Sequence, residues 1–369
     1  MDASKLYNIT FDLVRENKTL KYDEAISSII NGLSANNSEN IKVSFNTFET
    51  LSKNSFVNRL SPSNYKIYLL IDAHKYFGLD GFNWVNSILT DNSYNNPKII
   101  SELQIYQQKR NEFINTITAL NNSFKKLEID LHFYSDDSYE LGLIFPESVT
   151  KNSLNQISKE FNKWDQILRT IHEIKGEKPT EIKIDFVNHG SIEVFFENSY
   201  AVATCLMIII ERITKLYKNI LEIRLTREKL KSLGVPESEE KQIKDHENKI
   251  ISNELEKVKT DIVENHFHKD IDKSRKNELS NSLKLHIEYI AKSIDKGIII
   301  EITPPEIEEP SELNDDKTPK SSDVLKNELE NYEAKTKIAE KMSIINEDIR
   351  VISDNSKEIF KYLTEKNDE

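Results

Sequence analysis

Glycine is the residue whose scarcity most constrains this chain, because only 8 of its 369 residues are glycine. That is roughly 2%, against ~7% in ordinary proteins. Phosphate-binding loops, dinucleotide turns and many-stranded β architectures need glycine where the backbone adopts a positive φ or approaches a ligand closely. The sequence has no Gly-x-Ser-x-Gly elbow, Walker-type loop or Gly-x-Gly-x-x-Gly turn. We therefore expect a predominantly helical protein.

The N-terminal region, residues 1–126, is predicted to be mainly helical. Apolar residues recur every three or four positions over 22–33, after Pro62 and after Pro97, which is the period of a helix with one buried face. Proline in the first turn favours a helix start. Apolar residues alternate over 41–45, and we predict a short strand there.

Residues 127–302 are predicted to form an α+β core with antiparallel strands, arranged as hairpin–helix–hairpin–helix. Four segments alternate between apolar and polar residues, as half-buried strands do: 127–133, 139–145, 182–186 and 192–196. A helical pattern follows each pair of segments, and two further amphipathic helices and a fifth strand over 297–302 complete the core. The whole is a predominantly helical α+β fold.

The C-terminal part carries most of the net charge of −12. After residue 302 there are 10 Lys and Arg against 18 Asp and Glu, a net of −8, which leaves −4 for the rest. Residues 303–322 hold four of the nine prolines among acidic residues, which predicts a solvated linker.

A long amphipathic helix is predicted over 323–369, after the linker. Its apolar seam is formed by Ile338, Met342, Ile345, Ile349, Ile352, Ile359 and Leu363. Such a helix must bury its seam, either on the same chain or in an oligomer. The alternative is a partly ordered tail.

The best metal-binding candidate is the sequence His266-Phe267-His268-Lys269-Asp270. Imidazole is a common ligand of zinc-type ions, and the run resembles the start of the His-x-His-x-Asp-His motif of metallo-β-lactamase-like hydrolases. It departs from that motif at Ile271, where histidine is expected. The alternative to a metal site is a polar helix end with exposed histidines.

A second catalytic hypothesis is a magnesium nuclease. Glu181 and Lys183 form a Glu-x-Lys pair on a predicted strand, and Asp130, Asp136 and Asp137 lie on the preceding hairpin. The same residues also fit the solvated face of an ordinary strand. We assign no catalytic residue and no cofactor. The alternative function is a metal-dependent nuclease or hydrolase that uses His266, His268 and Asp270.

Nucleic acid is an unexpected partner, because 41 of the 50 basic residues are Lys and only 9 are Arg, the residue that contacts phosphate and guanine bidentately. The most basic stretch is 211–231. There Arg224 and Arg227 continue the apolar face set by Ile220, so we interpret them as salt-bridge partners between helices.

A cytoplasmic protein is expected. The start of the chain lacks a secretion signal, and no apolar run approaches the roughly 20 residues that span a bilayer. The single cysteine, Cys205, lies in an apolar run, where it suits a small buried side chain rather than a nucleophile.

Two segments carry a resemblance. The segment from Ile184 to Phe195, with Asn188-His189-Gly190-Ser191 at its turn, and the helical segment from Leu216 to Arg224 resemble a pattern in uncharacterised bacterial proteins. Some of those come from mobile, phage-defence-type loci. The resemblance includes no catalytic motif and implies an accessory or sensor-like component of a defence system.

The functional expectation from the sequence is a non-enzymatic protein. Several long helices with one apolar face, and the lack of a coherent catalytic set, favour a self-associating scaffold, sensor or regulatory subunit. We expect a homo-oligomer, with a further protein partner encoded nearby.

Overall fold

The computed structural model describes residues 3–92, 95–129, 138–178, 184–188, 192–233, 237–303, 321–354, 359–360 and 363. The chain forms two compact units, Met1–Phe133 (unit 1) and Tyr134–Glu369 (unit 2). Each unit has a hydrophobic core of its own, and the two are described separately.

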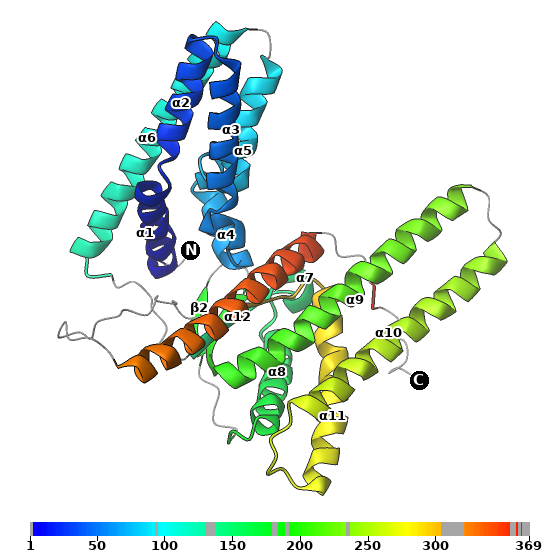
Figure 1. Cartoon of the computed structure of the whole chain (residues 1–369). Coiled ribbons are helices and arrows are strands. Elements are labelled where there is room, and N and C mark those ends of the chain that lie inside the picture. The colour runs from blue at the N-terminus through cyan, green and yellow to red at the C-terminus, as the bar shows by residue number, and fades with distance from the viewer. Residues whose placement is uncertain are drawn as a thin grey trace. The chain divides into compact units, whose positions relative to one another are not determined.

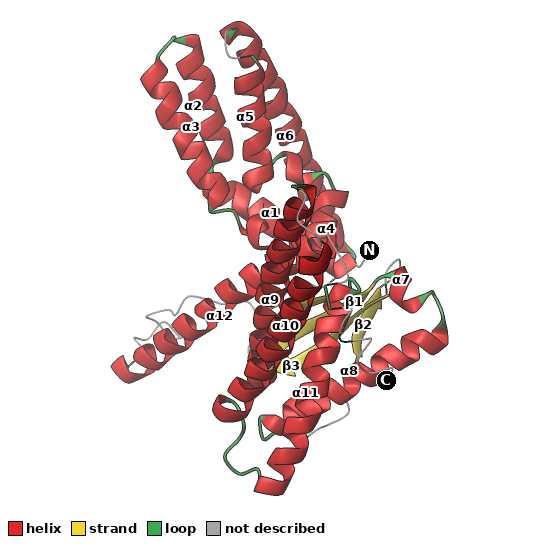
Figure 2. Cartoon of the chain, turned by 90° about the vertical axis from the view of Figure 1, so that its right-hand side faces the viewer, coloured by secondary structure: helices red, strands yellow, loops and turns green. Residues whose placement is uncertain are grey.

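Unit 1 is built from helices (Figures 1 and 2). They are α1 (Ala3–Leu20), α2 (Tyr22–Ser34), α3 (Ser38–Lys53), α4 (Pro62–Leu70), α5 (Gly78–Asp91) and α6 (Asn96–Lys126), with short 3-10 turns η1 (Phe56–Arg59) and η2 (Ala73–Lys75). Their apolar faces enclose a core in which Leu13, Ile26 and Leu103 are fully buried. The predicted helical character of this region is confirmed.

The strand predicted over 41–45 is wrong, because these residues lie within α3. Ile41 and Phe45 are four residues apart and both pack against the core, whereas Val43 between them is 55% exposed. Four residues is also the spacing of one helix face. A short alternation therefore fits either structure, and here the helix prevails.

A buried polar network joins the helices of unit 1 around Arg110 on α6. The Arg110 side chain is fully buried and donates to Asp23 at 2.6 Å and to Asn17 at 2.5 Å. Its guanidinium also lies over the rings of Tyr22 and Phe77, 5.1 and 5.2 Å from their centroids. A buried charge requires such partners.

Unit 2 combines a small sheet with long helices. Its strands are β1 (Ser138–Phe145), β2 (Ile184–Asn188), β3 (Ile192–Ser199) and β4 (Ile299–Thr303). Its helices are α7 (Glu147–Thr150), α8 (Leu154–Ile174), α9 (Tyr200–Ser232), α10 (Glu237–Asn265), α11 (Lys273–Asp295) and α12 (Ser322–Asp354). The strand order is β2-β3-β1-β4, and every pairing is antiparallel. The predominantly helical α+β fold is confirmed.

One of the two predicted hairpins is present. β2 and β3 pair as predicted, with Asn188 opposite Glu193. The first predicted hairpin is wrong, because β1 pairs with β3 along one edge and with β4 along the other. The segment predicted to pair with β1 was 127–133. Its first residue, Leu127, caps the end of α6, where its N–H donates to the Ser123 carbonyl at 3.0 Å. Residues 130–133 lie outside the described residues.

The core of unit 2 lies between one face of the sheet and the helices. Leu141 and Leu143 on β1, Val194 on β3 and Ile300 on β4 are almost fully buried there. Gly142 lies between the two leucines and points to the opposite face. A Cβ at this position would lie 2.6 Å from the side chains of both neighbouring strands, so the close approach requires glycine.

Candidate functional site

The apolar residues predicted for the C-terminal helix are buried within the same chain. The prediction of one helix over 323–369 is wrong, because α12 ends at Asp354 and Ile359 and Phe360 lie in a turn after it. α12 contacts α9, α11 and β4, and Figure 1 shows it running along α9. The residues assigned to oligomerisation or docking belong to the core of unit 2 and are each at most 8% exposed: Ile338, Met342, Ile345, Ile349, Ile352, Ile359 and Leu363. Of the two arrangements that the sequence leaves open, the structure has docking in cis.

Asp295, at the end of α11, holds the segment that follows α12. Its carboxylate accepts hydrogen bonds from the backbone N–H groups of Ile359 at 2.6 Å and Phe360 at 2.7 Å. The Arg224 guanidinium donates to the Ile359 carbonyl at 3.0 Å. The buried Phe360 ring meets Tyr217 edge-on, with 5.8 Å between ring centroids. Main-chain hydrogen bonds and apolar burial therefore both fix this segment.

Three basic residues of α9 form ion pairs with neighbouring helices of unit 2. Arg224 and Arg227 both bind Glu247 of α10, at 3.3 and 2.8 Å, and Glu247 is only 2% exposed. Lys218 forms an ion pair with Asp348 of α12. The interpretation of the two arginines as salt-bridge partners between helices is confirmed.

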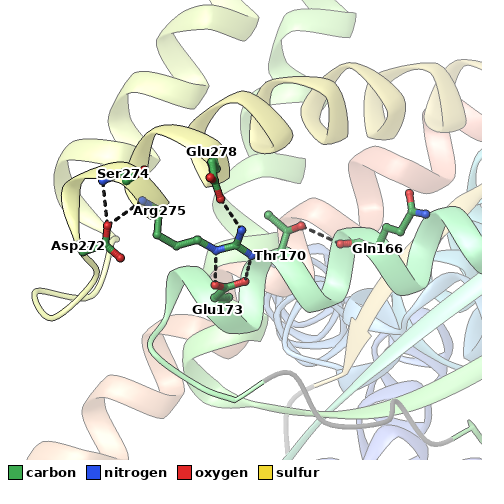
Figure 3. A network of polar contacts seen from close by, with 7 residues as sticks. All are labelled: Gln166, Thr170, Glu173, Asp272, Ser274, Arg275 and Glu278. Atoms are coloured by element: carbon green, nitrogen blue, oxygen red, sulfur yellow. Dashed lines mark hydrogen bonds and ion pairs between the residues drawn. The ribbon is translucent and has the colours of Figure 1, made fainter.

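The loop between α10 and α11 is anchored on the C-terminal end of α8 (Figure 3). Arg275 binds both carboxylate oxygens of Glu173, at 2.6 and 2.7 Å, and Glu278 at 2.6 Å. Asp272 begins α11 by accepting from the N–H groups of Ser274 and Arg275. The hydrogen bond from Arg275 lowers the pKa of the Glu173 carboxyl.

The two histidines of the predicted metal site lie in this loop and are held by main-chain contacts. The His268 N–H donates to the Ile174 carbonyl at 2.8 Å, and the His266 carbonyl accepts from Lys175 Nζ at 3.3 Å. The His268 ring lies against Gly176, whose φ is +77°, and a Cβ on Gly176 would be 2.6 Å from it. The loop is thereby packed closely on the end of α8.

The predicted metal ligands are only loosely gathered. His268 Nδ1 is 3.6 Å from an oxygen of Asp270, whose side chain is 89% exposed. Burial, followed by the charge of Lys175, lowers the pKa of His266. Within the described residues, no three His, Cys, Asp or Glu side chains form a group that could hold a metal ion. The structure therefore supplies no further ligand to His266, His268 and Asp270 from that part of the chain.

The remaining chemical candidates are the residues of the predicted nuclease site and Cys205. The nuclease candidates all lie outside the described residues: Glu181, Lys183, Asp130, Asp136 and Asp137. Cys205 is fully buried in α9, and burial raises the pKa of its thiol to about 12. A thiol in that state is a poor nucleophile.

His286 of α11 is a titratable group enclosed between helices. Its Nε2 lies 3.0 Å from the Thr170 hydroxyl on α8. Burial, together with the positive charge of Lys163, lowers the pKa of His286 from 6.5 to about 4. The neutral ring is therefore the form that the fold accommodates.

We expect His286 to make unit 2 less stable in acid. Its pKa is lower in the folded chain than in the unfolded one, so the unfolded state takes up the proton first. This contribution is complete above pH 6.5 and is lost as the pH falls towards 4. Allowing for partial exposure, the loss is about 2 kcal/mol. In urea unfolding at pH 7 and pH 4, His286→Gln should reduce the difference by that amount, whereas the exposed-site control His246→Gln should not. Equal differences in all three proteins would contradict this assignment.

A hollow of about 440 Å³ lies in unit 1 between α5, α6 and the turn before α5. Its centre is apolar: Ile88 and Tyr106 are buried, while Trp84 and Ile105 are each 50% exposed. An exposed tryptophan beside a hollow is typical of a surface that binds a partner. We call this region, with the charged residues at its two ends, the bipolar groove.

The two ends of the bipolar groove carry opposite charges. α5 and α6 run antiparallel, since Asn92 after α5 donates to Glu102 at 3.0 Å and the Tyr106 hydroxyl donates to the Lys75 carbonyl at 3.0 Å. Asp91 and Glu102 therefore lie at the end near the α5–α6 connection, and Lys75 and Lys109 lie at the other end.

The bipolar groove was not predicted from the sequence. In the apolar pattern after Pro97, Ile105 looks like part of the buried face of α6, but the buried residues of that helix are Ile99, Leu103, Tyr106, Arg110, Ile117 and Phe124. Ile105 falls outside this seam. The signal available in the sequence was that Ile105 lies outside the buried face of α6, directly after the helix that carries Trp84.

Comparisons of the chain with protein-family models, curated proteins and solved structures found no match. None of the described helices combines the length and apolar content needed to cross a bilayer.

Proposed function

We propose that the protein is a non-enzymatic, self-associating scaffold or regulatory subunit that acts in the cytoplasm, and that unit 1 carries its self-association surface. The bipolar groove is the observation that carries this proposal. Tryptophan is among the residues most enriched at binding hot spots, and an apolar centre between charged residues is typical of protein–protein interfaces. Trp84 and Ile105 are half exposed, and a partner bound there would bury their apolar surface away from water.

The C-terminal seam supports the same choice by exclusion. The sequence leaves open whether that seam packs on its own chain or pairs with a second copy, and in the structure its side chains are buried against α9, α11 and β4 of their own chain. Exchange between copies would first have to break the hydrogen bonds that Asp295 accepts from Ile359 and Phe360 and to expose the buried Phe360 ring. The exposed groove of unit 1 carries no such cost.

The setting of this role is a separate part of the proposal. The resemblance of 184–195 and 216–224 to proteins of phage-defence-type loci favours a bacterial defence system, with a further protein partner encoded nearby. That part depends on the sequence pattern alone.

Light scattering after size-exclusion chromatography tests the self-association. The chain has a mass of 42.9 kDa, and we expect a species of twice that mass between roughly 1 and 100 μM. Trp84→Ala should raise the dissociation constant by about 30-fold. The control is Val43→Ala on α3, which is 55% exposed and should leave the dissociation constant unchanged. A monomer at every concentration, or an unaffected Trp84→Ala variant, would refute the proposal.

A further inference from the structure

We infer that the bipolar groove binds the same groove of a second copy, with the two copies related by a twofold axis. This inference rests on the proposed function and specifies its interface. A twofold dimer uses one surface patch twice, so the patch must be complementary to itself. The bipolar groove meets this condition in both charge and shape.

The charge pattern is complementary to itself under a twofold rotation. An axis through the middle of the groove places the acidic end of each copy on the basic end of the other. Asp91 then meets Lys109 of the second copy, and the contact occurs twice. Because Lys75 and Glu102 already have partners of opposite charge within their own ends, Asp91 and Lys109 are the charges that select the orientation.

Asp91 and Lys109 are available for these contacts. Both are exposed, and neither has an ion-pair partner among the residues that the structure describes. The other two charged residues already have partners, since Lys75 binds Asp72 at 2.9 Å and Glu102 lies 3.8 Å from Lys98. Asp91 and Lys109 therefore define the expected pair.

The charged residues are spaced by whole turns on both helices. On α5, Asp91 follows Trp84 of the apolar centre by seven residues, and on α6, Lys109 follows Glu102 by seven residues. Seven residues are two helical turns, about 10 Å. Two copies of this helix pair can therefore align over the same length, as an antiparallel four-helix arrangement with charged contacts at both ends.

The apolar centre is complementary in shape. Trp84 is half exposed and lines a hollow of about 440 Å³, which is large enough for an indole. The twofold axis that pairs the charged ends also brings Trp84 of each copy to the hollow of the other. Each copy therefore provides one half-exposed side chain and one cavity, as hot-spot residues do when they pair across an interface.

Charge reversal tests the twofold pairing directly. Lys109→Glu places two acidic residues at each end contact of its dimer, and Asp91→Lys places two basic ones there, so each variant alone should dimerise at least about tenfold more weakly. In a mixed dimer, both end contacts join opposite charges again. One contact keeps the original Asp91 and Lys109, and the other pairs the two introduced side chains with their signs exchanged. We therefore expect the mixture to regain the wild-type dissociation constant. Lys42→Glu, at an exposed position of α3, is the matched control.

Sedimentation velocity on the two variants, separately and mixed, gives the result, with circular dichroism to verify that each is folded. Recovery in the mixture, with no effect of Lys42→Glu, supports the twofold dimer. Weakened variants that stay weak when mixed overturn the twofold pairing but leave self-association through this groove intact. Dimers unaffected by either reversal overturn the pairing as well. A wild-type chain that is monomeric throughout overturns the inference and the proposed function together.

Discussion

Replacing Ile349 by alanine should destabilise unit 2 by about 3 kcal/mol. Ile349 lies on the inner face of α12, 1% exposed, within the core that α12 shares with α9 and β4. Truncating a fully buried isoleucine removes apolar contacts and leaves a cavity, and such changes cost about 2–5 kcal/mol. The loss is this large only if α12 is a permanent part of the fold.

The matched control lies on the same helix. Ile344 is 61% exposed on the outer face of α12, so Ile344→Ala should change the free energy of unfolding by less than about 0.5 kcal/mol. The chain has two tryptophans, and Trp164 is buried in unit 2. In a Trp84→Phe background, urea unfolding followed by Trp164 fluorescence therefore reports on unit 2. Similar small losses for both alanine variants would show that the seam is not packed as described.

Replacing Arg110 by alanine should destabilise unit 1 by about 4 kcal/mol. The substitution leaves a cavity where a fully buried side chain stood and removes the donors that Asp23 and Asn17 accept from. Removing one member of a buried ion pair costs about 3–5 kcal/mol. Arg110→Lys should recover only part of this loss, because an ammonium lacks the planar fork that reaches both acceptors.

Hydrogen exchange measures this effect in unit 1 alone. Peptides from the middle of α2 and α6 should lose protection by a factor of about 10³ in Arg110→Ala. Arg59 is an exposed arginine of the same unit, and Arg59→Ala should preserve protection. Unchanged protection in Arg110→Ala would mean that the buried network does not stabilise these helices.

The fold was predictable wherever a long segment shows one period. The seams of α8, α9, α10, α11 and α12 each repeat over several turns, so chance alternation has little influence. Short segments failed for the opposite reason. Over 41–45, one apolar alternation fits a strand and a single helix face equally well.

Strand pairing was less predictable than the strands themselves. β1 and β4 are more than 150 residues apart in the chain. The local sequence does not indicate which strand pairs with the second edge of β1. The hairpin β2–β3 was predictable because the sequence places only a short turn signal, Asn188-His189-Gly190-Ser191, between two alternating segments.

The candidate site was not predictable to the same degree. The seam of α12 was predictable from Ile338 to Ile352, but Ile359 and Leu363 lie beyond the end of the helix at Asp354. The partner of the seam was not predictable, since an apolar seam docks equally well in cis or in trans. Trp84 and Ile105 look like core residues in the sequence. Only the tertiary structure shows that they are half exposed and that opposite charges flank them.

The central claim is that α12 docks within its own chain while unit 1 joins two copies. Carbodiimide cross-linking tests both parts at once, because this reagent links only ammonium and carboxylate groups that are in contact. The sample is an equal mixture of ¹⁴N- and ¹⁵N-labelled protein after subunit exchange. We predict that Lys218–Asp348 links join peptides of the same isotope only, and that about half of the Lys109–Asp91 links join different isotopes, as random pairing in a dimer requires. Mixed-isotope Lys218–Asp348 links, or no mixed-isotope Lys109–Asp91 links, would contradict the account.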